Sequence, residues 1–507
     1  AQAAGDLPPF DMPEIVVERS RHAAHGDYAS PVCLRLARAA RRAPREIAAQ
    51  VVSHLPEAEL VGQVEIAGPG YINITLSAGW LAAQVEAILQ AGDRFGDLLD
   101  EERGTAQVEF VSANPTGPLT VGRGRGGVMG DTLANLLAAA GYRVEREYYF
   151  NNAGRQMQIL GNSVRLRYLE LLGQTVEFPA DHYQGDYIRE IAADLYEEHG
   201  DGLAEADESV FRKRAEAVIF AQIRATLARL GIHFDNYFNE NGLYESGLVW
   251  EVLEELRRRG YVYEKDGATW FRVTDLGGKK DRVLVKSTGE PTYRLPDIAY
   301  HIEKIRRGYA LMVTILGADH LEEYPDVLAG LRALGYETDN VRVVFHQFVN
   351  LVREGKPVRM STREGHFITL DELLDEVGRD AVRYFMLARS PDSHMDFDLD
   401  LAVEQSDRNP VYYIQYAHAR IASILRHAQA SGWDVDAPAD VALLHHPSEL
   451  ALVKEMLRLP EVVAQAVEKL SPHFLPFYAH DLAAAFHTFY RDCRVVSSDP
   501  ADADLTR

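Results

Sequence analysis

The sequence predicts a multidomain α/β protein whose central part is a doubly wound parallel sheet. At 507 residues the chain is too long for a single core, so two to four domains are expected. Short apolar runs at 107–111, 144–149, 312–316 and 342–346 alternate with helical patterns. This alternation is typical of a Rossmann-like sheet, whose ligands bind beyond the carboxyl ends of the strands.

Composition narrows the class of protein. A hydrophobic content of 47 % with 25 % charged residues is ordinary for a folded chain, and no run of 18 apolar residues predicts a membrane span. The first residues, AQAAGDLPPF, show no signal peptide. Cys33 and Cys493 are too far apart in sequence to indicate a disulfide framework or a thiolate zinc site. We therefore expect a cytoplasmic protein that makes no contact with a membrane.

The net charge of −23 argues against indiscriminate binding of nucleic acid. It does not exclude a local basic face, because charge acts over roughly a Debye length of about 8 Å. Any nucleic-acid contact should therefore be confined to local patches.

Residues 1–95 resemble a small α+β domain. Helical patterns at 29–43 and 44–55 are separated by Pro44, which suits the first turn of a helix. Val64–Leu76 reads as strand, turn, strand, with alternating apolar residues. Residues 96–105 form a polar linker.

Three arginines of the first helical pattern, Arg35, Arg38 and Arg42, share one helix face by their spacing. A solvated face explains this pattern, and so does a contact with a phosphate backbone.

The stretch from Val108 to Asp131 contains the most informative motif of the central domain. It reads as a buried strand, a Gly/Pro-rich turn at 112–117, and a helix that opens at Val128 and ends near Gly141. A glycine-rich turn before a helix N-terminus presents bare N–H groups that hold phosphate. An ordinary βα turn that uses glycine for tight packing is the alternative.

Residues of about 175–280 resemble an insertion in the sheet. The insertion is rich in charged helices and includes an apolar stripe of Leu248, Val252, Leu253 and Leu256. A hairpin with Asp266-Gly267 at its turn follows.

From about 395 the chain is predicted to be helical to its end. Tyr412, Tyr413, Tyr416 and Arg420 crowd one helix. Residues of these types at these spacings either pack in a core or stack nucleic-acid bases. The last residues lack an apolar pattern, so we expect the chain to stop short of its natural end.

Glu109 is the most informative single residue, because a carboxylate in a central parallel strand is costly unless it is paired. Asp297 follows Tyr293 by four residues, so the two point the same way if the segment is helical. Two carboxylates and a phenol could enclose a planar guanidinium. The alternative is that Glu109 pairs with an internal arginine and Asp297 caps a helix.

A basic segment, GKPVRMSTREG, precedes a helix that Thr369 and Glu372 should start with a capping box. Its Lys356, Arg359 and Arg363 could clamp the phosphates of ATP as charge develops on them. A basic surface turn is the simpler explanation.

Several of these segments together resemble one family. SANPTGPLTVGRGRGG is similar to the HIGH-motif region of class I aminoacyl-tRNA synthetases, and VRMSTREG is similar to their KMSKS loop. More narrowly, the chain resembles the bacterial arginyl-tRNA synthetases in VEIAGPGYINITL, YYFNNAGRQM, LGADHLEEYPDVL and NPVYYIQYAHARI. The matches follow one order over nearly the whole chain.

The resemblance implies an arginine–tRNA ligase of three parts. Residues 1–95 would be an additional tRNA-binding domain, and 106–390 a Rossmann-like catalytic domain carrying the insertion. Residues 395–507 would be a helical anticodon-binding domain that is truncated at its C-terminus. The implied partners are L-arginine, tRNA(Arg) and ATP with Mg²⁺, without a tightly bound protein-ligated metal, and we expect a monomer.

The resemblance also implies roles for particular residues. Those that bind arginine would be Glu109, Ser112, Asn114, Tyr293 and Asp297. Those that bind ATP would be Pro118, Thr120, Gly122, Arg123, Gly317, Asp319, His320, His346, Gln347, Met360 and Ser361. Catalysis would use Thr120, Gly122, Arg123, Arg359, Ser361 and Arg363, and tRNA would contact Arg35, Arg38, Tyr412, Tyr416 and Arg420.

The sequence departs from the family at the tetrad Thr120–Arg123, where the family has histidine at both ends. Arg123 keeps a cation near phosphate but does not give up its proton. Two alternatives follow: a catalytically impaired, synthetase-like tRNA-binding protein, and a class I synthetase for another amino acid. The second fits poorly with two buried acids, which a neutral side chain would not balance.

Overall fold

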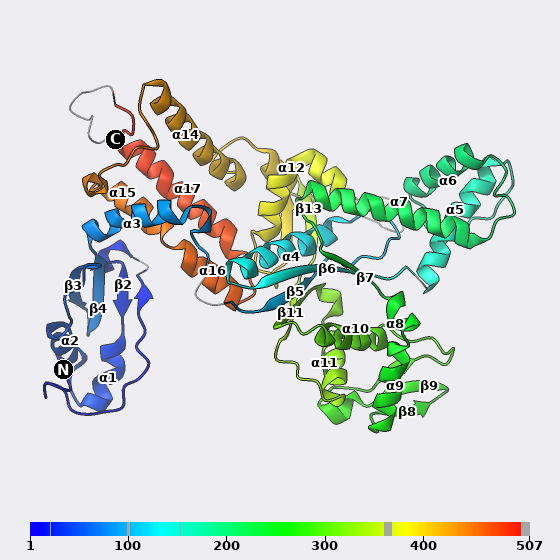
Figure 1. Cartoon of the computed structure of the whole chain (residues 1–507), viewed down its shortest axis with the longest axis horizontal. Coiled ribbons are helices and arrows are strands. Elements are labelled where there is room, and N and C mark those ends of the chain that lie inside the picture. The colour runs from blue at the N-terminus through cyan, green and yellow to red at the C-terminus, as the bar shows by residue number, and fades with distance from the viewer. Residues whose placement is uncertain (21, 99–101, 153, 359–367, 498–507) are drawn as a thin grey trace. The chain divides into compact units, whose positions relative to one another are not determined.

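The computed structural model describes the chain except for residues 21, 99–101, 153, 359–367 and 498–507 (Figure 1). The chain divides into two compact units. One comprises Ala1–Phe95, Tyr416–Leu459 and Asp481–Arg507, and the other comprises Gly96–Gln415 and Pro460–His480.

A five-stranded sheet forms the centre of the second unit, in the order β12-β11-β5-β6-β7, and every neighbouring pair is parallel. Its strands are β5 (Thr105–Glu109), β6 (Arg143–Phe150), β7 (Asn236–Asn239), β11 (Leu311–Gly317) and β12 (Val341–His346). The predicted doubly wound parallel sheet is confirmed. Because β6 lies on one side of β5 and β11 on the other, the strand order reverses at β5, where such sheets bind ligands.

The predicted insertion at about 175–280 is not continuous. β7 lies inside that range and pairs with β6, with Glu147 opposite Asn236. The segment NYFN is short and half-buried, so its pattern does not separate it from the charged helices around it. The chain therefore leaves the sheet between β6 and β7 and again between β7 and β11.

Helix α4 (Val121–Ala139) packs on one face of the sheet (Figure 1). The prediction that this helix opens at Val128 is wrong by two turns, because the glycines before Val128 have low helix propensity. They serve close packing instead. A Cβ on Gly126 or Gly130 would lie 3.0 Å from His346 or 2.2 Å from Phe110, respectively.

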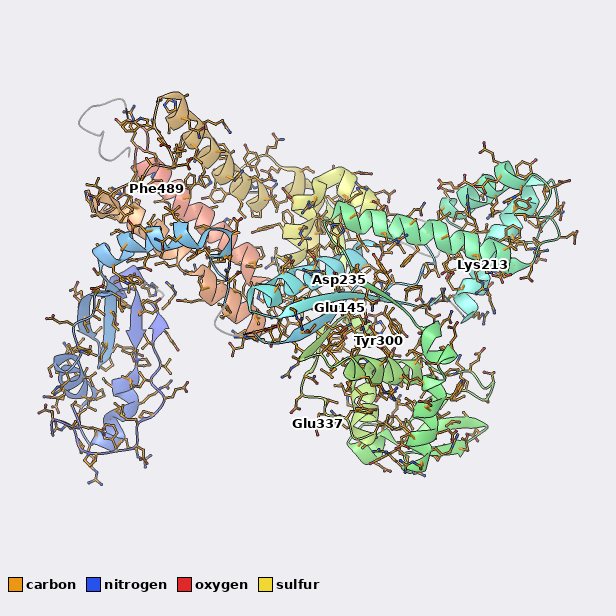
Figure 2. The ribbon with its side chains drawn as sticks, viewed as in Figure 1. Glu145, Lys213, Asp235, Tyr300, Glu337 and Phe489 are labelled. Carbon is orange, nitrogen blue, oxygen red and sulfur yellow. The ribbon has the colours of Figure 1, made fainter. Side chains whose placement is uncertain are left out.

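Helix α10 (Arg294–Arg306) covers the other face of the sheet (Figure 1). This face is polar, because Gln107, Glu109 and Glu147 alternate with the apolar residues that meet α4. Tyr300, which Figure 2 shows between α10 and the sheet, donates a hydrogen bond to Glu147. Burial alone would raise the pKa of Glu147, but hydrogen bonds from Arg307 and Tyr300 outweigh burial and hold this pKa below its ordinary value.

The remaining elements of this unit surround the sheet. The helices are α5 (Gly154–Leu171), α6 (Asp186–His199), α7 (Glu208–Arg229), α8 (Asn241–Glu245), α9 (Leu248–Arg258), α11 (Tyr324–Ala333), α12 (Leu370–Leu387) and α13 (Leu399–Val403). The strands are β8 (Val262–Lys265), β9 (Ala268–Phe271), β10 (Arg282–Val285), β13 (Val349–Arg353), β14 (Lys356–Pro357) and β15 (Met395–Asp398).

Three local predictions in this unit are confirmed. The apolar stripe of α9 is buried. β8 and β9 form the hairpin, and both turn residues, Asp266 and Gly267, have positive φ, as a two-residue primed turn requires. Thr369 and Glu372 form the capping box of α12.

The N-terminal part of the other unit contains an antiparallel sheet in the order β1-β2-β4-β3. Its elements are β1 (Glu18–Arg19), β2 (Tyr28–Ser30), α1 (Val32–Ala40), α2 (Pro44–Ser53), β3 (Val61–Ala67), β4 (Tyr71–Leu76) and α3 (Ala78–Ala91). The predicted strand–turn–strand is confirmed.

The helix predicted at 29–43 is too long at both ends. Residues 28–30 form β2, and α1 ends at Ala40, where Arg41 adopts a left-handed conformation. Arg42 therefore lies beyond the helix and donates a hydrogen bond to the carbonyl of Asp6. Arg35 and Arg38 remain on α1, and both are exposed.

The end of the chain is helical, with α14 (Pro410–Ala430), α15 (Pro447–Met456), α16 (Leu459–Glu468) and α17 (Phe474–Asp492). None of the helices in the described residues has the length and apolar character needed to cross a membrane. Cys33 and Cys493 are both free.

Candidate active site

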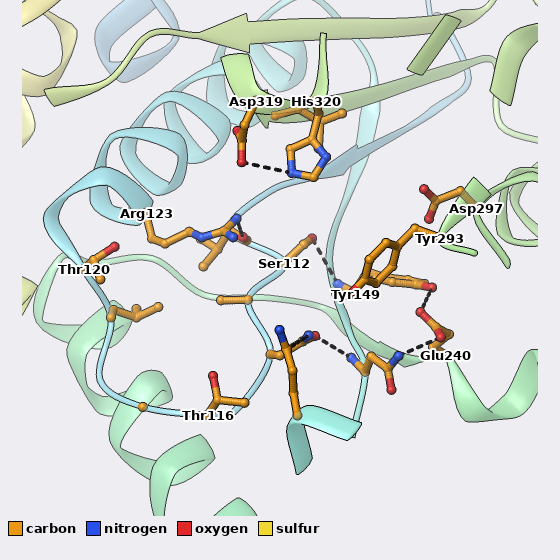
Figure 3. A pocket seen from close by; sticks show the side chains of 18 of the residues that line it. Ser112, Thr116, Thr120, Arg123, Tyr149, Glu240, Tyr293, Asp297, Asp319 and His320 are labelled. Atoms are coloured by element: carbon orange, nitrogen blue, oxygen red, sulfur yellow. Dashed lines mark hydrogen bonds and ion pairs between the residues drawn. The ribbon is translucent and has the colours of Figure 1, made fainter. Parts of the chain in front are cut away.

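A cavity of about 1040 Å³ opens beyond the carboxyl ends of the parallel strands. Residues that follow β5, β6, β7 and β11 all contribute to its wall, for example Ser112, Asn151, Glu240 and Asp319. Figure 3 shows two ends to this pocket: Thr120 and Arg123 lie at one, and Tyr149, Tyr293, Asp297 and Glu240 at the other. The cavity therefore occupies the place that the topology predicts for a ligand.

The loop after β5 is strained. Val111 and Ser112 have φ values of 67° and 41°, which is rare for L-residues and especially so for a β-branched one. The hydroxyl of Tyr148 fixes the loop by donating to the Ala113 carbonyl (2.7 Å) and accepting from the Ala113 N–H (3.2 Å). Asn114 accepts a hydrogen bond from the N–H of Asn151 (3.1 Å). Strain held in this way is typical of a functional loop.

The basic end of the pocket is the N-terminus of α4. Thr120 is the N-cap, but its side chain makes no capping hydrogen bond, so the first N–H groups of the helix are left for a ligand. The guanidinium of Arg123 donates to the carbonyl of Val111 (3.2 Å). A helix N-terminus with an arginine in its first turn attracts phosphate.

The acidic end contains Glu109, which is already paired. Lys304, fully buried on α10, lies 2.6 Å from Oε2 of Glu109. The hydroxyl of Ser112 donates to Oε1 (3.1 Å). The alternative that Glu109 pairs with an internal arginine is therefore right about an internal cation and wrong about its type.

Glu240 is the second acid at this end and is as buried as Glu109, each being 6 % exposed. It follows β7, and its carboxylate accepts hydrogen bonds from the Tyr149 hydroxyl (2.5 Å) and the Asn151 amide (2.7 Å). Burial raises the pKa of Glu240, and the Tyr149 hydrogen bond only partly opposes this.

Asp297 is the third acid and lies in the first turn of α10, one turn after Tyr293. Burial raises the pKa of Asp297 well above its ordinary value, and repulsion from Glu240 and Glu109 adds to the effect. Its carbonyl accepts a hydrogen bond from Nδ1 of His301 (2.8 Å). Burial lowers the pKa of His301 to about 3, so this imidazole is neutral.

The cavity brings together most of the residues predicted to bind the small substrates. Those that line it are Glu109, Ser112, Asn114, Pro118, Thr120, Arg123, Tyr293, Asp297, Asp319 and His320. Gly122, Gly317, His346 and Gln347 are not part of its wall. Burial lowers the pKa of His346 to about 4, and this side chain packs close to Gly126 instead.

Four predicted residues, Arg359, Met360, Ser361 and Arg363, lie outside the described residues. The predicted tRNA contacts Tyr412, Tyr416 and Arg420 all belong to α14. The guanidinium of Arg420 lies over the rings of Tyr416 (4.3 Å) and Tyr490 (4.7 Å).

Sequence reasoning missed three residues at the acidic end: Tyr149, Glu240 and Lys304. Glu240 comes directly after a strand that the sequence did not reveal, so its place at the sheet edge was hidden. Lys304 had a usable signal, because it follows Asp297 by seven residues and so shares a helix face with it.

Three family models match successive parts of the chain. They are described as the arginyl-tRNA synthetase N-terminal domain (residues 1–76), the class I (R) tRNA synthetase catalytic domain (84–405) and the DALR anticodon-binding domain (414–507). Together they follow the order that the sequence resemblance implies.

Individual proteins are similar over almost the same length. The arginine–tRNA ligase of Pelodictyon phaeoclathratiforme is 49 % identical, covering 96 % of this chain and 90 % of its own. That of Salinibacter ruber is also 49 % identical, covering 98 % and 92 %. The solved arginyl-tRNA synthetase of Thermus thermophilus shares the fold, with a TM-score of 0.74 at 23 % identity over 97 % and 92 % of the two chains.

Proposed function

This chain belongs to the class I arginyl-tRNA synthetases, and we propose that it is an arginine–tRNA ligase. ATP and L-arginine give arginyl-adenylate and pyrophosphate, and the arginyl group then passes to the 3′ end of tRNA(Arg). The observation that carries the proposal is the match of near-half identity to an arginine–tRNA ligase over 96 % of the chain. A pocket with one acidic and one basic end, suited to a cationic substrate beside a triphosphate, supports it.

The arginine subsite is proposed at the acidic end of the cavity. Its wall comprises Glu109, Ser112, Asn114, Tyr293 and Asp297. The Asp297 carboxylate provides negative charge for a guanidinium, and the exposed Tyr293 ring can cover the planar group. Asn114 is assigned to the backbone end of the amino acid, because it lines the cavity on the loop that follows β5.

The ATP subsite is proposed at the basic end. Pro118, Thr120 and Arg123 line it, and Gly122 belongs to the first turn of α4, whose N–H groups face phosphate. Asp319 and His320 line the cavity from the segment after β11, and Gly317 precedes them. We also assign Met360 and Ser361, and, behind the wall, His346 and Gln347.

The reaction depends on the correct positioning of the two substrates, and the protein does not need to form a covalent bond to either of them. The carboxylate of arginine attacks the α-phosphorus in line, and the bond to pyrophosphate breaks. Arg123, together with Thr120 and the N-terminus of α4, stabilises the negative charge that develops on the phosphates. Arg359, Ser361 and Arg363 are assigned to the leaving pyrophosphate.

Magnesium is proposed to enter with ATP. Among the described residues no group of three His, Cys, Asp or Glu side chains is placed to hold a metal ion. Phosphate oxygens and water would therefore provide most of the ligands, as is usual for magnesium.

The tRNA is proposed to bind through local patches on an acidic chain. Arg35 and Arg38 on α1 would contact the phosphate backbone. Tyr412, Tyr416 and Arg420 on α14 would contact bases, within or beside the matched anticodon-binding domain. We place the reaction in the cytoplasm and expect a monomer.

ATP–pyrophosphate exchange, measured with each amino acid in the presence and absence of tRNA, tests the function. We expect tRNA-dependent exchange with arginine alone. Exchange with another amino acid would contradict the assigned substrate. Binding of tRNA without any exchange would instead indicate the catalytically impaired, synthetase-like protein.

A further inference from the structure

We propose that Arg125 is a positioning residue for adenylate formation, which fixes the carboxyl end of β12 and the turn before β15 against the first turns of α4. This inference rests on the proposed function, because adenylate formation is the step that the positioning serves. Arg125 follows Arg123 on α4, but it is not part of the cavity wall. It therefore acts through the segments that it binds and not through a contact with a substrate.

The guanidinium of Arg125 is fully buried and bound to backbone carbonyls from two separate segments. It donates hydrogen bonds to the carbonyl of Gln347 (2.7 Å) and to those of Ser390 (3.0 Å) and Ser393 (3.1 Å). Burial lowers the pKa of Arg125 to about 10, and the charge of Asp392 only partly opposes this, so the side chain is a cation at neutral pH. A buried cation is costly, and an apolar side chain of similar volume would fill the same space without that cost. The arginine is therefore suited to joining these segments.

The two segments that Arg125 binds are also joined to each other. Gln347 follows β12 directly, and its N–H donates to the carbonyl of Pro391 (2.9 Å). The hydroxyls of Ser390 and Ser393 share a hydrogen bond (2.7 Å). Strand β13 begins shortly after Gln347 and β15 shortly after Ser393, and these two strands pair in parallel. One guanidinium therefore fixes the common base of β13 and β15.

The described residues on both sides of the segment 359–367 are attached to the start of α4. On the N-terminal side, β14 pairs with β13, whose base the buried arginine fixes. On the C-terminal side, the N–H of Leu370 donates to the carbonyl of Leu119 (2.8 Å). Thr369 also forms a bridge with Thr120, the N-cap of α4. The chain therefore returns to the N-terminus of α4 at both points.

The glycines on either side of Arg125 allow these close approaches. A Cβ on Gly124 would lie 2.7 Å from Leu370, the first residue of α12. A Cβ on Gly126 would lie 3.0 Å from His346, the last residue of β12. The start of α4, the end of β12 and the start of α12 thus meet around the buried guanidinium.

This junction matters for the transition state because negative charge develops on both sides of the bond that breaks. The N-terminus of α4, with Thr120 and Arg123, is assigned to the phosphates, and the segment before α12 is assigned to the leaving pyrophosphate. Each substrate can bind to one side alone, whereas in-line displacement needs both sides in place. A shift of about 1 Å can cost about 100-fold in rate. Loss of the junction should therefore lower kcat more than it raises KM.

The test compares Arg125→Lys with the wild type in tRNA-dependent ATP–pyrophosphate exchange. Lysine keeps the charge but presents one compact ammonium, which does not span the carbonyls of two segments. Arg125→Lys should lower kcat by about 10-fold or more, and the KM values for arginine and ATP should stay within about 3-fold of the wild type.

Arg383→Lys is the matched control. The guanidinium of Arg383 also joins α4 to another segment, through the carboxylate of Asp131 (2.7 Å) and the carbonyl of Leu230 (3.0 Å). Its contact lies further along α4, and neither Arg383 nor Asp131 is part of the cavity wall. Arg383→Lys should therefore leave kcat within about 2-fold of the wild type. Thermal unfolding of both variants separates the two roles, because a merely structural role of Arg125 predicts that kcat follows the loss of stability in both.

A kcat of Arg125→Lys equal to that of the wild type would overturn this inference and leave the proposed function standing, and so would an equal loss of kcat in Arg383→Lys. A wild type without arginine-dependent exchange would overturn the function itself. If Arg125→Lys does not fold, Ser390→Ala removes a side-chain hydrogen bond from the turn that Arg125 binds. That variant should lower kcat about 3-fold at constant KM, and an unchanged kcat would again contradict the proposal.

Discussion

At the scale of single residues, the site is defined by which charges are already paired. Glu109 and Lys304 neutralise each other inside the protein, whereas Asp297 and Glu240 keep raised pKa values beside the cavity. The sequence pointed to Glu109 because an acid in a central strand is costly. It did not reveal Lys304, because strand periodicity says nothing of the helix that covers a strand. Within the described residues Glu109 is thus paired with a buried lysine, whereas Glu240 accepts hydrogen bonds from the neutral side chains of Tyr149 and Asn151.

The Glu109–Lys304 pair gives the first prediction. Glu109→Gln should destabilise the protein by about 3–5 kcal/mol, because a fully buried ammonium loses its partner. The double variant Glu109→Gln/Lys304→Met should recover most of that loss. Unfolding in denaturant measures both. A double variant that is no more stable than Glu109→Gln would show that the pairing is not the source of the effect.

Arg123 gives a second prediction at this scale. The sequence resemblance aligns it with a histidine of the family, and its guanidinium donates a hydrogen bond to the Val111 carbonyl at the basic end of the cavity. Arg123→Ala should lower the kcat of exchange by about 100-fold, the typical loss when one donor to a developing charge is removed. The arginine KM should stay nearly constant. A kcat equal to that of the wild type would exclude Arg123 from catalysis.

At the scale of elements, the packing of helix α4 explains why its first turns are rich in glycine. Gly124, Gly126 and Gly130 let the helix approach Leu370, His346 and Phe110, so the alternative that these glycines serve tight packing is confirmed, and phosphate binding at the helix N-terminus stays a prediction. Its N-terminus remains open toward the cavity, and its body is packed closely against the sheet.

Two glycines of α4 provide a matched pair for stability measurements. A Cβ at position 130 would lie 2.2 Å from the Phe110 ring, so Gly130→Ala should destabilise the protein by about 1–3 kcal/mol. A Cβ at position 122 would meet nothing within 4 Å, and Gly122→Ala should be neutral or stabilising by up to about 1 kcal/mol. Thermal unfolding measures both. Equal effects would contradict the packing role of Gly130.

Elements that depend on local sequence could be predicted, and elements that depend on distant packing partners could not. The long apolar strands, the hairpin with Asp266-Gly267 and the capping box of Thr369 could all be predicted, because each depends on local sequence. The start of α4 could not, since glycines signal a turn whenever their packing partners are unknown. β7 could not either, because its four residues belong to the sheet only through pairing with β6.

At the scale of the whole molecule, a net charge of −23 coexists with a function that needs tRNA. The two are compatible when basic contacts are local, because screening limits the reach of the acidic residues elsewhere. The family models match an N-terminal domain, a catalytic domain and an anticodon-binding domain, in this order along the chain. The two-ended cavity described above is lined by residues of the catalytic part.

The most direct test of that cavity is a crystal structure of the protein with L-arginine and a non-hydrolysable ATP analogue. We predict the guanidinium at the acidic end of the cavity beside Asp297 and Tyr293, the triphosphate at the N-terminus of α4 beside Arg123, and Glu109 still bound to Lys304. A guanidinium that points away from Asp297, or a triphosphate bound elsewhere, would contradict the account.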